Sequence, residues 1–244
     1  MIRKQLMERA NHKPTDFRWR GGDVSRLEGF SDNVFGFALT LLVVSLEVPK
    51  TFDELAATMK GFVGFAVCFA LLAVVWHDHY SYFRRYGLND ATVTVLNLIL
   101  LFLVLFYVYP LKFLFTLLIS VFMGLSPSTG KPVIDVHQMP ALMMIYGAGF
   151  VSIYIIFVLL YCHAYRKRKE LDLNELETFD TRASIGSDLV LVAIGLTSIL
   201  IAWRGGTRLV FLSGSMYWMI GRAMMVFWTI VGKRRRPLED RAHG

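Results

Sequence analysis

Six long runs of apolar residues follow one another along the chain, separated by short polar segments. They cover about residues 27–48, 59–79, 91–123, 139–163, 184–203 and 207–231. Each run reaches the roughly 20 apolar residues that a helix needs to cross the hydrocarbon core of a bilayer, and the third is considerably longer. The pattern therefore predicts an all-α polytopic membrane protein with six transmembrane helices.

Prolines and basic clusters mark where these runs end or bend. Pro49 ends the first run because proline cannot continue the helical hydrogen-bond ladder, and Pro110 predicts a kink or a tilt in the third. Basic residues at 166–169 and 233–236 stop the fourth and sixth runs. We therefore expect a basic cytoplasmic N-terminal segment (1–26), a six-helix transmembrane domain (27–232) and a basic cytoplasmic tail (233–244).

The positive charges lie mainly on one side of the predicted spans. Of the 26 Lys and Arg residues, 19 fall in the termini and in the connections on the same side as the termini. Five lie on the other side, and Lys112 and Arg222 lie within spans. Cytoplasmic loops are enriched in Lys and Arg, so both termini are predicted to be cytoplasmic. The net charge of +7 has the same origin, and nothing indicates nucleic-acid binding.

Composition and motifs argue against an enzyme or a metal protein. The chain is 55% hydrophobic and only 18% charged, whereas about a quarter of the residues in soluble domains are charged. Cys68 and Cys162 lack the spacing of a metal site and look like small buried hydrophobes. His77 and His79 are two possible ligands without an acidic or cysteine cluster, so a hydrogen-bonded histidine is favoured. There is no GxSxG, HExxH, P-loop or GxGxxG motif, so no enzyme and no cofactor are expected.

Charged residues open the first span. Arg26 and Asp32 are six residues apart, so they are not close neighbours on one helix face and each needs a partner on another helix. Ionisable residues within a membrane are costly and commonly functional. The alternative is a polar helix entrance at the headgroup level.

These residues also form a recognisable motif. The sequence Arg26-x-x-x-Phe30-Ser31-Asp32 resembles the RxxxFSD signature of the transmembrane-protein-175 family, which comprises endolysosomal potassium channels and their bacterial relatives. A second block is similar to the second and third helices of that family and contains Trp76, His79, Phe83, Asn97 and Pro110. The resemblance covers residues 26–111.

The resemblance implies a potassium-permeable channel. In the family, four six-helix subunits surround a pore lined by the first helix, without the carbonyl filter of ordinary potassium channels. The Thr-Val-Gly-Tyr-Gly sequence of such a filter does not occur here. The expected partners are therefore three further copies of the chain, permeant potassium ions and the lipid bilayer of a prokaryotic plasma membrane.

The resemblance also assigns residues to the pore. In the family, apolar side chains narrow the pore from the fifth residue after the signature Asp, which gives Phe37, Leu41 and Val44 here, with Thr40 as the pore threonine. Spacings of four and three place them on one helical face, and such a hydrophobic neck gates by dewetting. Relatives usually carry Ile or Leu at the Phe37 position, so a pore that is tighter, more often closed or shaped by ring rotation is expected. From spacing alone, a helix-packing seam is the favoured interpretation of this stripe.

A polar network is expected to join the first three helices and to have a structural or gating role. Its members are Arg26, Phe30, Ser31, Asp32, Trp76, His79 and Asn97. Two other functions stay open: a secondary transporter, which needs Gly or Pro breaks at mid-membrane, and a non-conducting scaffold or sensor. Residues 182–188 repeat the Arg and Ser-Asp spacing of 26–32, but the flanking residues differ and coincidence is favoured.

Overall fold

Six long helices carry most of the chain in the computed structural model, which describes residues 17–44, 50–122 and 134–243. They are α2 (Arg26–Val44), α3 (Phe52–Tyr86), α4 (Ala91–Phe122), α5 (Met139–Arg166), α6 (Glu175–Gly205) and α8 (Met219–His243). Shorter elements are η1 (Val136–Gln138), η2 (Gly206–Arg208), α7 (Val210–Ser215) and η3 (Met216–Trp218). The predicted all-α membrane fold with six helices is confirmed.

Five segments of the described chain are long and apolar enough to cross a membrane. They are Phe62–Tyr86, Ala91–Leu114, Val136–Arg166, Glu175–Arg208 and Val210–Asp240. The helix α2 is shorter, with 19 residues, and carries Arg26, Glu28 and Asp32 in its first half. The helix that bears the signature motif is therefore the shortest of the six long helices, and its charges lie in its first half.

Several helices extend beyond the predicted apolar runs. The 35 residues of α3 span about 52 Å at 1.5 Å per residue, more than the roughly 30 Å of a hydrocarbon core. This helix ends only at Tyr86, before Gly87, whose φ of 60° is a backbone conformation that favours glycine. α6 begins at Glu175, ahead of its apolar run, because Asn174 and Glu177 form a capping box. Hydropathy locates the lipid-facing part of a helix, whereas caps set its ends.

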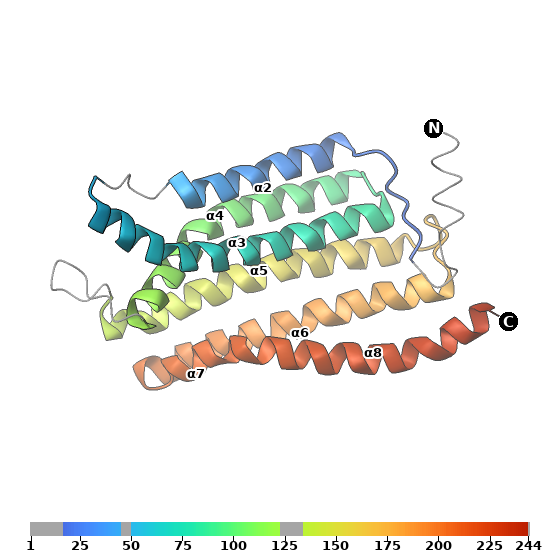
Figure 1. The fold of residues 1–244 in the computed structure, drawn as a ribbon. Coiled ribbons are helices and arrows are strands. Elements are labelled where there is room, and N and C mark those ends of the chain that lie inside the picture. The colour runs from blue at the N-terminus through green and yellow to red at the C-terminus, as the bar shows by residue number, and fades with distance from the viewer. Residues whose placement is uncertain (1–16, 45–49, 123–133, 244) are drawn as a thin grey trace.

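We had expected the sixth span to be one continuous helix, but the structure divides it. The chain turns through η2 and α7, and η3 separates α7 from α8. α8 then continues through the predicted basic tail, where Arg235 pairs with Asp180 of α6. Pro110 lies inside α4, and the second half of that helix turns away from the line of the first half (Figure 1).

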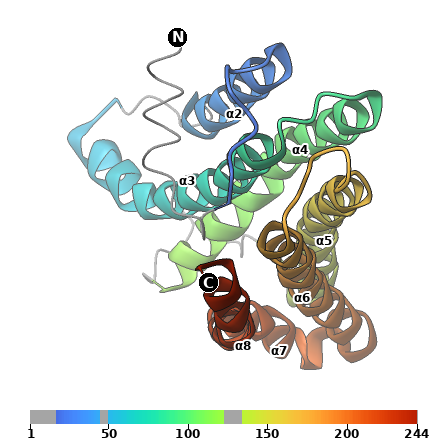
Figure 2. The ribbon, with the colours of Figure 1, turned by 90° about the vertical axis from the view of Figure 1, so that its right-hand side faces the viewer.

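The helices run side by side, and successive long helices are antiparallel (Figure 1). α2 lies at one edge of the bundle, on α3 and α4, while α8 packs against α6 at the opposite edge (Figure 2). The connections at 87–90 and 167–174 lie at the same end of the bundle as residues 17 and 243. The two ends of the described chain therefore emerge on one side.

Candidate functional site

The chain entering α2 is fixed to two other helices. The Ser25 hydroxyl accepts a hydrogen bond from the Glu28 amide, and the Glu28 carboxylate accepts one from the Ser25 amide. This reciprocal cap starts the helix. Arg18 and Arg20 both bind the carboxylate of Glu177 at the start of α6, with the shortest N–O distances at 2.9 and 2.7 Å. Sequence reasoning missed Glu177, although its position three residues after Asn174 is a signature of a capping box.

One face of α2 packs against the bundle. Phe35, Ala38 and Leu42 are at most 3% exposed. They lie on the side of the helix that contacts α3 and α4. The spacing of three and four residues produces this buried stripe, which anchors α2 along its length.

Polar contacts cross the same buried face. The Asn97 side chain in α4 donates a hydrogen bond to the Ser31 hydroxyl at 2.8 Å, and Ser31 donates to the Leu27 carbonyl at 2.8 Å. The Nε2 atom of His79 in α3 lies 2.8 Å from the Asn97 carbonyl oxygen. Because that oxygen accepts, Nε2 carries the hydrogen. One fully buried chain of hydrogen bonds thus joins α2, α4 and α3.

A second polar contact lies nearer the surface. The indole of Trp76 in α3 donates a hydrogen bond to the Asp32 carboxylate at 2.8 Å. Four polar side chains of the expected network and Trp76 therefore do meet. Arg26 and Phe30 lie on the exposed side of α2, and Arg26 makes no hydrogen bond or ion pair within the part of the chain that the structure describes. Their place in the network stays a prediction.

The opposite face of α2 is left exposed by the part of the chain that the structure describes. Phe37 is 67% exposed, Leu41 is 36% exposed, and Thr40 is also exposed. The side chain of Val44 is not among those described. A Cβ atom added at Gly36 would meet open space. Of the residues expected to line the pore, Phe37, Thr40 and Leu41 thus share an exposed, largely apolar face.

The Thr40 hydroxyl is oriented by its own helix. It lies 2.8 Å from the Gly36 carbonyl and 2.9 Å from the Phe37 carbonyl, so its single hydrogen is directed to the backbone. A hydroxyl has one donor and two acceptor lone pairs. The lone pairs of Thr40 therefore remain available on the exposed face, which suits a cation.

Lys112 approaches the far end of α2. Its ammonium group donates a hydrogen bond to the Leu42 carbonyl at 3.2 Å. A helix C-terminus carries unsatisfied carbonyls and a partial negative charge, which a cation stabilises. Lys112 thus fixes the end of α2 that its polar network does not reach.

Comparison with known proteins identifies the family. The sequence profile described as endosomal/lysosomal potassium channel TMEM175 matches residues 26–107. A protein of Marivirga tractuosa named "Potassium channel" is 41% identical over 235 residues, which cover 92% of this chain and 95% of the relative. The chain belongs to the TMEM175 family. The profile match spans α2, α3 and much of α4, the three helices joined by the polar contacts.

Two further comparisons agree with TMEM175 membership. "Potassium channel Cha6605_3372" of Chamaesiphon minutus is 28% identical over 189 residues, covering 72% of this chain and 85% of the relative. The crystal structure of the potassium channel MtTMEM175, as a threonine-to-alanine variant with a nanobody fusion protein, superposes with a TM-score of 0.80. It is 39% identical, with coverage of 89% of this chain and 97% of that one. TMEM175 proteins are integral membrane proteins and ion channels, not enzymes.

Two other residues that the sequence analysis named, His77 and Arg222, lie outside the polar network of this TMEM175 protein. His79 is buried in the polar chain, whereas His77 is exposed and faces a different cavity. No group of three His, Cys, Asp or Glu residues that could hold a metal occurs within the described residues. Arg222 in α8 is exposed and makes no hydrogen bond or ion pair with the rest of the described chain.

Proposed function

We propose that this chain forms a potassium-permeable channel in which four copies surround a pore lined by α2. The observation that carries the proposal is the contrast between the two faces of α2. One face is anchored by buried apolar and hydrogen-bonded side chains, while the other exposes Phe37, Thr40 and Leu41. We take potassium as the permeant ion because two relatives of this chain are named potassium channels.

Four copies of this face would form a hydrophobic constriction. One helix cannot enclose an ion path, but copies related by rotation around an axis place their exposed stripes opposite one another. Rings of Phe37, Leu41 and Val44 would narrow the path and gate it by dewetting. The lone pairs of four Thr40 hydroxyls would replace part of the hydration shell of a potassium ion between the apolar rings.

The polar contacts give a physical basis for gating. Ser31, Asn97 and His79 hold the first half of α2 against α4 and α3, and Asp32 binds Trp76 of α3. A tilt or rotation of α2 that changes the pore radius would strain these bonds. These hydrogen bonds therefore form a network with a structural and gating role.

The membrane orientation follows from the charge asymmetry. The N-terminal segment (1–26) and the tail (233–244) lie in the cytoplasm, and residues 27–232 form the transmembrane domain of a bacterial plasma membrane protein. The start of the described chain and the C-terminal end of α8 lie at one end of the bundle, which supports a shared side for both termini (Figure 1).

A flux assay with purified protein in liposomes tests the function. We expect passive potassium flux that follows the membrane potential and needs no second solute. A slow flux coupled to another solute would favour a secondary transporter. No flux from an intact assembly would favour a non-conducting scaffold or sensor.

Cross-linking tests the assembly independently of conduction. A cysteine in place of Leu41 should form bonds between subunits, because the four α2 helices face a common axis. Leu196 of α6 is more exposed, at 51%, and a cysteine there provides the control that should not cross-link. Monomers in mild detergent across a range of lipids would contradict the tetramer.

A further inference from the structure

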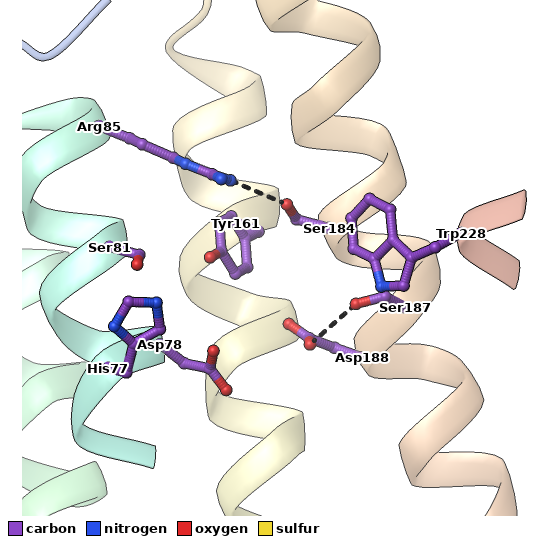
Figure 3. A pocket seen from close by; sticks show the side chains of 9 residues that line it. All are labelled: His77, Asp78, Ser81, Arg85, Tyr161, Ser184, Ser187, Asp188 and Trp228. Atoms are coloured by element: carbon purple, nitrogen blue, oxygen red, sulfur yellow. Dashed lines mark hydrogen bonds between the residues drawn. The ribbon is translucent and has the colours of Figure 1, made fainter. Parts of the chain in front are cut away.

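A polar cavity lies on the other side of α3 from the pore helix. It has a volume of about 160 Å³ and lies between α3, α5, α6 and α8 (Figure 3). Its walls carry two carboxylates, Asp78 and Asp188, three serine hydroxyls, one guanidinium and three aromatic or imidazole rings. The remaining lining residues are Ser81, Ser184, Ser187, Arg85, Tyr161, His77 and Trp228.

One carboxylate oxygen in this cavity lacks a partner. Asp188 is only 8% exposed, and its Oδ1 atom lies 3.5 Å from the Ser187 hydroxyl, a weak contact. The Oδ2 atom is buried and accepts no hydrogen bond from the described chain. Figure 3 places the Asp188 carboxylate on the side of α6 that faces Asp78. An ionised carboxylate buried without a counter-charge is strongly unfavourable, so in its charged form Asp188 is open to a positively charged ligand.

The charges that face the cavity do not balance. When both carboxylates are ionised, Asp78 and Asp188 contribute two negative charges against the one positive charge of Arg85. The Arg85 guanidinium points to the Ser184 hydroxyl, at 3.4 Å, and not to Asp188 (Figure 3). Tyr161 of α5 and Trp228 of α8 add no charge. One positive charge is therefore missing.

We propose that this cavity binds one partly hydrated monovalent cation, such as potassium or sodium, between Asp78 and Asp188. A single positive charge completes neutrality, whereas a divalent ion would leave an excess. The carboxylates and hydroxyls are oxygen ligands, which hard cations prefer. The volume has room for an ion with several waters, each of which occupies about 30 Å³, whereas a proton needs no such space.

The site lies within one subunit and is separate from the exposed face of α2. His77 and Asp78 lie between Trp76 and His79, the two α3 residues that bind the pore helix network. An ion in the cavity would therefore tie this part of α3 to α6. The Ser187-Asp188 pair, which repeats the spacing of Ser31-Asp32, would thus contribute to cation binding.

Anomalous scattering from rubidium tests the site directly. Crystals of the full-length protein grown with rubidium as the only alkali cation should give an anomalous peak between Asp78 and Asp188. Asp188→Asn crystals should lack this peak, because the variant restores neutrality without an ion. Ordered cavity side chains and no peak in the wild type would overturn the proposal.

Thermal unfolding provides a second test that does not require crystals. Replacing N-methyl-D-glucamine with potassium, at constant ionic strength and pH, should raise the Tm of the wild type. The shift should be lost in Asp188→Asn and kept in Glu170→Gln, which alters an exposed carboxylate. A shift that persists in Asp188→Asn would place the ion elsewhere, and a Tm that responds only to pH would identify a proton; either result contradicts the proposal.

Discussion

The side chain of Phe37 is the bulkiest group on the uncovered face of α2. At 67% exposure it contacts little within its own chain. Phe37→Ala should therefore raise potassium flux in liposomes several-fold and weaken discrimination against sodium, because a wider neck lowers the dewetting barrier for any cation. Phe102→Ala in α4 is a matched control, since Phe102 is 66% exposed but lies outside the proposed pore. Equal flux in the wild type and in both variants would place the constriction elsewhere.

Thr40 acts through its hydroxyl in this proposal and not through its volume. Thr40→Val keeps the shape but removes the oxygen, so potassium flux or the preference for potassium should fall while the tetramer persists. Thr40→Ser retains the hydroxyl and should retain most of both. Reversal potentials with potassium on one side and sodium on the other measure the preference. If valine and serine behave alike, the hydroxyl is not an ion ligand.

The hydrogen bonds of Asn97 are fully buried and join three helices. Asn97→Leu would remove the donor to Ser31 and leave the His79 Nε2–H without an acceptor. A buried unsatisfied group costs about 1–3 kcal/mol, so the Tm should fall clearly. Thr197→Val is the control, because its exposed hydroxyl bonds only to Ala193 in its own helix. Similar Tm values for the two variants would mean that the polar chain does not stabilise the fold.

Asp90 joins the start of α4 to the end of α5. Burial raises the pKa of this carboxyl, but hydrogen bonds from His163, the Val93 amide and Lys167 outweigh burial and lower the pKa to about 2. Because the pKa is lowered on folding, the carboxylate stabilises the protein above about pH 4, and this contribution is lost as the pH falls towards 2. Asp90→Asn should lower the Tm at pH 7, and the difference should shrink on acidification. A difference independent of pH would contradict this assignment.

The elements differ in how well the sequence predicts them. Helical periodicity alone places Phe37 and Leu41 on one face, but it cannot show whether that face is covered, because packing depends on α3 and α4. The bond from Asn97 to Ser31 joins positions 66 residues apart, and only the family resemblance suggested it. Arg18 and Glu177 are 159 residues apart, and no local pattern connects them. The interruption at Met216–Trp218 also escaped prediction, because no proline marks it.

At the scale of the whole molecule, orientation depends on charge more than on packing. The side that holds the termini carries 19 Lys and Arg residues, against five on the other side. The described ends of the chain lie at one end of the bundle, so a single side must hold both (Figure 1). A reporter active only in the cytoplasm should therefore give a signal when fused to either terminus. The same reporter inserted beside Lys50, between α2 and α3, should be silent. A signal at Lys50, or its loss at one terminus, would require a different number of membrane crossings or the opposite orientation.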